Sequence, residues 1–264
     1  MQILIGFALG IIVGYTAFRL GALTTSGAVS AAAIGGLIFG IGGLPWASLL
    51  LLFFISSSLL SRVYKRRKMP LIEKFAKSSK RDHGQVLANG GVAVVLVLLH
   101  WYSPHMDWVW AAFAGSMAAV NADTWATELG VLSQSAPRLI TNGKVVPRGT
   151  SGGITLVGYL ATLAGAGLIA LAAGLFAQPG SLVIPVVILA GLIGATIDSI
   201  LGASIQGIYY CPACDKETES HPWHYCGTRT KHMRGWKWVN NDIVNLVCSF
   251  TGAIVAFGGW ILIR

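Results

Sequence analysis

Residues 152–176 read GGITLVGYLATLAGAGLIALAAGLF and contain no charged side chain. A helix of about 20 apolar residues crosses the hydrocarbon core of a bilayer, so we expect this stretch to span a membrane. The whole chain has the same character, because 54% of its 264 residues are hydrophobic, only 11% are charged and the mean hydropathy is +0.67. Soluble domains carry about 25% charged residues. The composition therefore excludes a soluble globular protein and predicts an all-α, polytopic membrane helical bundle.

Further apolar stretches on both sides of this one bring the expected number of transmembrane segments to about eight. Their ranges are 3–18, 26–41, 46–60, 86–102, 108–129, 152–176, 182–205 and 241–263. The second and third are short, and the Gly42-Gly43-Leu44-Pro45 turn between them allows either a helical hairpin or one irregular re-entrant unit. Residues 1–264 are expected to form one integral membrane domain. No basic segment precedes the first span, so a cleaved signal peptide is not expected.

The basic residues lie on one side of this arrangement. Of the 19 Lys and Arg residues, 18 fall in alternate loops and only Arg264 does not. The positive-inside rule assigns that side to the cytoplasm and both termini to the outside of the cell membrane. The net charge of +9 is therefore a one-sided layer and not a nucleic-acid footprint. Its densest part, between Arg62 and Arg81, is expected to meet anionic lipid.

Polar residues within the spans also gather at the cytoplasmic ends. Asp123, Asp198 and Asp242 supply hard oxygen ligands of the kind that suits Mg²⁺, with Glu128 as a further ligand or an orienting group. Amides that could bind phosphate oxygens are Asn89, Asn121, Asn241 and Asn245. The alternative for each amide is an interhelical hydrogen bond with no functional role. Because four separate segments deliver these groups to one level, we predict a cytoplasmic active site.

The loop KVVPRGTSGG, residues 144–153, adds a candidate anion site. It is expected to lead straight into the helix of residues 152–176, and the N-terminus of a helix attracts phosphate. Lys144 and Arg148 would neutralise phosphate charge, and the backbone of Gly149, Thr150, Ser151 and Gly152 would approach the phosphate oxygens. The loop is not a Walker A motif, because G-x-x-x-x-G-K-[ST] is absent.

Residues 207–239 form an expected cytoplasmic insert that resembles a zinc ribbon. Cys211 and Cys214 have C-x₂-C spacing, and Cys226 follows with His221 and His224 before it. Disulfides are rare in the cytoplasm, whereas three thiolates and one imidazole make a closed zinc site. We expect structural Zn²⁺ on Cys211, Cys214, Cys226 and His224, with His221 as the alternative fourth ligand. The same residues could instead hold a catalytic zinc, or the C-x₂-C cysteines could form a redox pair.

Several longer sequence motifs surround these candidate site residues. They are SSSLLSR (56–62), RDHGQVLANGG (81–91), NADTWATELG (121–130), PRLITNGKVVPRGTSGG (137–153), GATIDSILGASIQG (194–207) and WVNNDIVNL (238–246). This series resembles the membrane family that includes animal transmembrane protein 19 and the plant phytyl-phosphate kinase. The resemblance covers the chain from Gly27 to Asn245. It implies phosphorylation of an isoprenoid monophosphate to the diphosphate by a nucleoside triphosphate, and a looser similarity to dolichol and phytol kinases favours CTP.

The hypothesis from the sequence is therefore a Mg²⁺-dependent isoprenoid-phosphate kinase at the cytoplasmic membrane face. Its partners would be an isoprenoid phosphate lipid, a nucleoside triphosphate and anionic membrane lipid, with no nucleic acid. The acceptor phosphate is already ionised near neutral pH, so positioning and charge stabilisation matter more than a general base. Three different functions stay open: a cytidylyltransferase-like membrane enzyme, a prenyl-phosphate transporter or flippase, and a non-catalytic scaffold.

Overall fold

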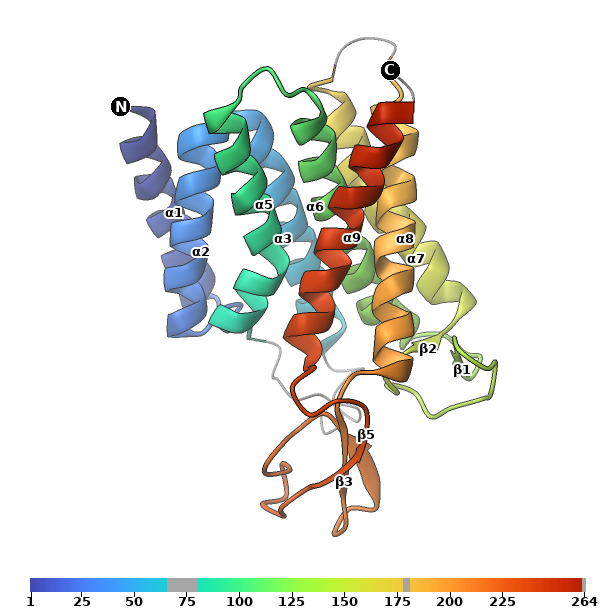
Figure 1. Ribbon diagram of the computed structural model, residues 1–264. Coiled ribbons are helices and arrows are strands. Elements are labelled where there is room, and N and C mark those ends of the chain that lie inside the picture. The colour runs from blue at the N-terminus through green and yellow to red at the C-terminus, as the bar shows by residue number, and fades with distance from the viewer. Residues whose placement is uncertain (66–79, 178–180, 263–264) are drawn as a thin grey trace.

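The computed structural model describes residues 1–65, 80–177 and 181–262, and these form a bundle of long helices with a small β-rich module at one end (Figure 1). The helices are α1 (Gln2–Arg19), α2 (Thr25–Leu37), the π-helical turn η1 (Ile38–Gly42), α3 (Gly43–Val63), α5 (His83–Tyr102), α6 (Trp108–Gly130), α7 (Leu156–Gly174), α8 (Val183–Ser204) and α9 (Asn241–Leu262). Each expected span falls on one of these helical segments. The prediction of a membrane helical bundle is confirmed.

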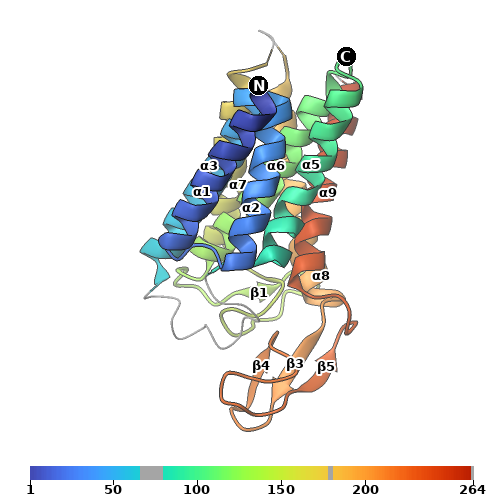
Figure 2. The same ribbon diagram turned by 90° about the vertical axis from the view of Figure 1, so that its left-hand side faces the viewer.

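The second and third expected spans are a helical hairpin. The helical stretch Thr25–Val63 is 39 residues long and changes direction at η1 and Gly43, whose φ of 72° is readily adopted only by glycine. Helix α3 then returns to the end of the bundle where α2 began (Figures 1 and 2). The Gly42-Gly43-Leu44-Pro45 segment is therefore the turn that its composition indicates.

The N-terminus and the end of α9 lie at the end of the bundle opposite the β-rich module (Figure 1). Six helical segments of the described chain are long and apolar enough to cross a membrane, with Thr25–Val63 counted as one of them. The exact number of crossings and the outside location of the termini stay predictions. The expected lipid anchor between Arg62 and Arg81 lies largely outside the described residues, because residues 66–79 are not described.

Helix α6 is not among those six segments, and its position explains why. Residues 111–122 of this helix are all buried, since α3, α5, α7, α8 and α9 pack around it. Small side chains permit this packing: a Cβ atom on Gly115 would meet the carbonyl oxygen of Gly252 on α9 at 2.5 Å. A helix enclosed by other helices needs no apolar surface for lipid, so α6 tolerates Asn121, Asp123 and Glu128.

Within the described residues, each helix that begins at the β-rich end carries a side-chain cap. Thr24, Asp82, Thr155 and Asn240 accept hydrogen bonds from backbone N–H groups in the first turns of α2, α5, α7 and α9. Such caps stabilise a helix start by about 1 kcal/mol each. At the opposite end, α1, α3, α6 and α8 begin without a side-chain cap. The polar character of the β-rich end is thus present in helix starts as well as in loops.

The expectation that the glycine-rich loop leads directly into a helix is wrong. Strand β2 (Gly153–Ile154) pairs with β1 (Arg138–Leu139), and α7 begins only at Leu156 after its cap Thr155. The 152–176 stretch therefore begins as an extended loop. Pairing with a strand 14 residues earlier in the chain is a contact that local composition does not reveal, since Leu139 pairs with Gly153.

The insert between α8 and α9 is a three-stranded antiparallel sheet in the order β4-β3-β5. Its strands are β3 (Ile208–Cys211), β4 (Lys216–Thr218) and β5 (Lys231–Arg234). Arg234 Nη1 donates to the carbonyl oxygens of Gly202 and Ala203 at 3.2 and 3.1 Å, which caps the C-terminus of α8. The insert is therefore fixed to the bundle and extends from the same end as the basic loops (Figure 2).

Candidate functional site

A cavity of about 310 Å³ is lined by residues from the β-rich ends of the helices and by Glu219 of the insert. Its wall is built by α3, α5, α6, α7, α8, α9, the glycine-rich loop and the insert. Of the residues expected to form the site, the cavity lining contains Asn89, Asp123, Glu128, Arg148, Gly149, Thr150, Ser151, Gly152, Asp198, Asn241 and Asn245. Segments from across the sequence thus meet at one level, as the distribution of polar residues predicts.

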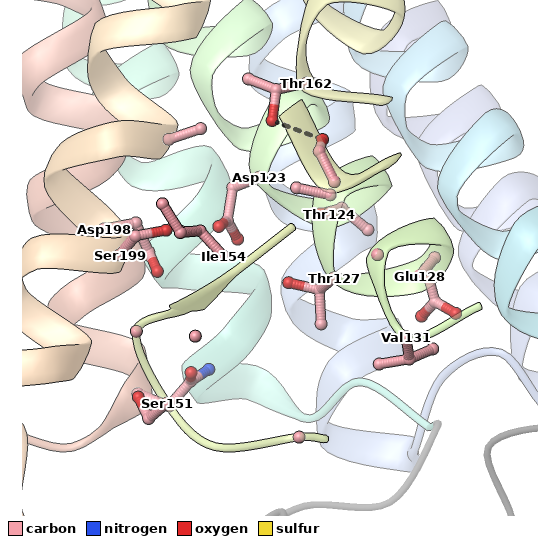
Figure 3. A pocket seen from close by; sticks show the side chains of 18 of the residues that line it. Asp123, Thr124, Thr127, Glu128, Val131, Ser151, Ile154, Thr162, Asp198 and Ser199 are labelled. Carbon is pink, nitrogen blue, oxygen red and sulfur yellow. Dashed lines mark hydrogen bonds between the residues drawn. The ribbon is translucent and has the colours of Figure 1, made fainter. Parts of the chain in front are cut away.

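Two carboxylates face each other in this cavity. Asp123 of α6 and Asp198 of α8 lie side by side in Figure 3 and interact directly. The Oδ2 atom of Asp198 is buried and has no hydrogen-bond partner among the described residues. Neighbouring buried carboxylates repel one another unless a proton or a cation lies between them. This donor set, hard oxygens with an unpartnered buried atom, fits Mg²⁺.

A second acidic group is held on the opposite side of α6. Glu128 Oε1 accepts a hydrogen bond from Ser61 Oγ of α3 at 2.7 Å. The guanidinium of Arg81 lies close enough for its charge to interact with Glu128, and Arg81 also donates to Ser58 Oγ at 2.9 Å. Burial lowers the pKa of Arg81 and the negative charge of Glu128 opposes that shift. Glu128 is therefore oriented by α3 and Arg81 at the rim of the cavity.

The backbone of Arg81 is itself held in place. Its N–H donates to the carbonyl oxygen of Ala22 at 3.0 Å, and its carbonyl oxygen accepts from the N–H of Thr24 at 3.0 Å. These bonds tie the segment before α5 to the start of α2. The positively charged side chain of Arg81 is thus held at the cavity by bonds between two loops that are far apart in the sequence.

The glycine-rich loop forms the part of the cavity wall next to the C-terminal end of α8. Gly149 and Gly152 both have φ of +78°, a conformation that favours glycine. The backbone of Gly152 lies against the last turn of α8, where an added Cβ atom would meet the backbone nitrogen of Ala203 at 2.5 Å. Ser151 Oγ donates to Gln206 Oε1 at 2.8 Å. The loop is therefore bound to the end of α8 and held close to Asp198.

Three expected site residues do not reach the cavity. Asn121 is fully buried one level deeper, where its Oδ1 accepts from Ser56 Oγ and Ser57 Oγ at 3.1 and 3.4 Å. Its Nδ2 donates to the carbonyl oxygen of Gly165 on α7 at 2.8 Å. The phosphate-binding role expected for Asn121 is corrected to an interhelical hydrogen-bond role, because both ends of the amide are used in joining α3, α6 and α7.

Lys144 and Asp242 are also absent from the cavity lining. Lys144 lies in the exposed turn that follows β1, outside the cavity. Asp242 is on α9 between the two lining residues Asn241 and Asn245, which share a helix face because they are four positions apart. Asp242 itself is not among the residues that line the cavity. The structure therefore places neither Lys144 nor Asp242 in the cavity lining, and their expected roles at the phosphates and the metal stay predictions.

Several lining residues carry no signal that marks them in the sequence as site residues. They are Ser61, Arg81, Thr155, Tyr159 and Glu219. Ser61 and Arg81 are partial exceptions, because they stand in the SSSLLSR and RDHGQVLANGG motifs. Glu219 has no such signal, because it stands within the insert and reaches the cavity only when the insert folds onto α8.

The expected zinc ligands come together in the insert. The ligand atoms of Cys211, Cys214, His224 and Cys226 all lie within 4.8 Å of one another. Three thiolates and one imidazole at this separation fit a tetrahedral zinc site. His221, the alternative fourth ligand, instead stacks on Tyr209 with ring centroids 4.7 Å apart. The geometry therefore favours His224 over His221.

Bundle and cavity together define an integral membrane protein with an acidic, glycine-rich site at one end. The family described as Integral membrane protein DUF92 matches residues 8–253. The chain belongs to this family, and the expected membership in the family of transmembrane protein 19 and phytyl-phosphate kinase is confirmed.

Similar proteins occur in plants and archaea. Protein PGR of Arabidopsis thaliana is 35% identical over 260 residues, which cover 89% of this chain and 88% of that protein. An uncharacterized membrane protein of Methanocaldococcus jannaschii is 34% identical over 188 residues, covering 70% of this chain and 75% of that protein. Protein VTE6, chloroplastic, of Arabidopsis thaliana is 26% identical over 238 residues, which cover 89% of this chain and 64% of that protein. No solved structure matches the chain.

Proposed function

We propose that this protein is an isoprenoid-phosphate kinase, which converts a prenyl monophosphate to the diphosphate with a nucleoside triphosphate, CTP being favoured. The observation that carries the proposal is the Asp123–Asp198 pair, which lines one cavity with the glycine-rich loop. Carboxylates for a metal beside a phosphate-binding loop are the groups that phosphoryl transfer requires. Membership in a family that includes phytyl-phosphate kinase supports the class of substrate.

Mg²⁺ would be held by Asp123 and Asp198, and when bound it would neutralise charge on the donor phosphates. The backbone of residues 149–152 would approach the phosphate oxygens. Arg148 and Arg81 bring positive charge to the same cavity. These cations favour binding of two phosphorylated substrates, which would otherwise repel each other.

In the proposed reaction, an oxygen of the prenyl phosphate attacks the γ-phosphorus of the nucleoside triphosphate. A new P–O bond forms, the bond from the γ-phosphorus to the β,γ-bridging oxygen breaks, and a nucleoside diphosphate leaves. The attacking oxygen carries no proton near neutral pH, because the first pKa of a phosphate monoester is far lower and the second is about 6. The chain therefore needs positioning groups, and Asn89, Asn241 and Asn245 line the cavity in that role.

Helix α7 offers a place for the prenyl tail. Gly158, Tyr159 and Thr162 line the cavity, and Leu156 and Leu160 on the same helix are exposed on the surface of the bundle. A lipid phosphate would place its head in the cavity and its chain along apolar helix surface. We propose that the cavity faces the cytoplasm, because 18 of the 19 basic residues fall in the loops of the expected cytoplasmic side.

The test uses purified full-length protein in detergent with γ-³²P-labelled CTP or ATP and prenyl monophosphates of several chain lengths. We expect a labelled prenyl diphosphate that requires Mg²⁺ and is lost in D123N and D198N. Release of pyrophosphate with a cytidylyl-lipid product would instead identify a cytidylyltransferase-like enzyme. If prenyl phosphate crosses liposome membranes with no diphosphate formed, the protein is a transporter and the kinase proposal fails.

A further inference from the structure

The insert that carries the cysteine–histidine cluster also contributes to the cavity wall. Glu219 follows strand β4 directly and lines the cavity together with Asp123 and Asp198. Of the residues that line the cavity, it is the one from the insert. A module with only a structural role would have no need to place a carboxylate there.

Gln206 holds this carboxylate in position. It is 2% exposed and lies between α8 and β3, where its Nε2 donates to Glu219 Oε1 at 2.9 Å. Its Oε1 accepts the hydrogen bond from Ser151 in the glycine-rich loop. One buried amide therefore joins the insert to the loop, and both of its ends are used.

The charge of Glu219 reaches the carboxylate pair. Its electrostatic field acts on Asp198, whose buried Oδ2 has no hydrogen-bond partner among the described residues. Three carboxylates in one small cavity are unfavourable without a compensating cation. Arg234 fixes the insert to the end of α8, so the third carboxylate cannot move away without breaking that cap.

We propose that Glu219 is a supporting carboxylate of the divalent-cation site formed by Asp123 and Asp198, which raises the cation affinity of that pair through its charge from the wall of the same cavity. Folding of the insert thereby completes the site, with Gln206 as the positioning residue. This inference rests on the proposed function in that both use the Asp123–Asp198 pair as a cation site. It adds that the cation affinity of the cavity depends on the insert.

The experiment measures Mn²⁺ binding to the purified full-length protein in detergent by electron paramagnetic resonance of the free ion. We expect E219Q to weaken Mn²⁺ binding at least about ten-fold, since loss of supporting groups alone costs 10- to 100-fold in affinity. The matched control is E217Q, the same substitution on strand β4 at a residue outside the cavity lining, which should stay within about two-fold of wild type. D198N serves as the reference for loss of the pair.

The outcomes separate this inference from the kinase proposal. If D198N weakens Mn²⁺ binding and E219Q does not, the inference is wrong and the kinase proposal is unaffected. If both variants weaken binding but no prenyl diphosphate forms, the kinase proposal fails and the inference holds. Unchanged binding in both variants overturns the cation site itself. If E219Q does not fold, E219D compared with E217D decides, because E219D withdraws the carboxylate by one methylene and should weaken binding where E217D does not.

Discussion

Replacement of Asn121 by alanine tests whether this residue belongs to the helix interface or to the chemistry. The variant loses the bond from Nδ2 to the Gly165 carbonyl and the two bonds that Oδ1 accepts from Ser56 and Ser57. Interhelical hydrogen bonds in membrane proteins contribute about 0.6 kcal/mol each, so three are worth about 2 kcal/mol. The small cavity left behind adds about 1 kcal/mol. We therefore expect N121A to lower the free energy of unfolding by about 3 kcal/mol.

The measurement is equilibrium unfolding of the purified protein in mixed dodecyl maltoside and SDS micelles, followed by circular dichroism. S57A is the matched control, because it removes one 3.4 Å bond from the same cluster and should cost about 0.5 kcal/mol. Mn²⁺ affinity is measured on the same samples and should stay within about two-fold of wild type, since Asn121 does not line the cavity. Wild-type stability together with a large loss of Mn²⁺ or nucleotide affinity would show that the structural assignment of Asn121 is wrong.

Three further substitutions test the carboxylate pair, the loop and the insert. D198N should lower phosphoryl transfer by about 10²-fold or more, yet should not lower the melting temperature in the absence of divalent cation, because the amide relieves the repulsion that two facing carboxylates exert unless they share a proton; a melting temperature below that of wild type would contradict this. G152A should destabilise the protein by about 3 kcal/mol, because its φ is +78° and the new Cβ atom meets the backbone of α8. The control G143A, with φ of +69° and nothing within 4 Å, should cost only about 1 kcal/mol, and equal thermal shifts would refute the close approach. Elemental analysis should detect zinc in the wild-type protein and in H221A but not in H224A; the reverse result would make His221 the ligand.

The helices could be predicted from the sequence because lipid imposes a composition that is read directly. Apolar stretches such as those of α7 and α8, which alternate with basic loops on one side, are expected to form membrane-spanning helices and little else. The polar layer is equally visible, since Asp123 and Asp198 close their spans and Asn241 opens the last span, which places all three at the same membrane face. These features are local in sequence and need no knowledge of which helices are neighbours.

Other features depend on contacts between distant segments and are not visible in the sequence. Asn121 and Asp123 are two positions apart on α6, yet one joins helices and the other lines the cavity, because α3 and α7 cover only the first. The delayed start of α7 follows from the pairing of Gly153 with Leu139. Glu219 stands 21 positions after Asp198 and lines the same cavity only because the insert folds onto α8. Each of these outcomes is decided by tertiary packing rather than by residue type.

The close packing of the bundle and the geometry of the cavity have one origin. Gly194 of α8 lies against Ala119 of α6, where an added Cβ atom would meet the Ala119 Cβ atom at 2.5 Å. Four residues further along each helix stand Asp198 and Asp123, and the two helices run in the same direction (Figure 1). One helical turn advances both chains by about 5.4 Å, so the approach of the two backbones at Gly194 sets the separation of the two carboxylates. Any side chain at Gly194 must push α8 away from α6 and with it one carboxylate from the other. The glycine at position 194 is therefore a requirement of the site as well as of helix packing.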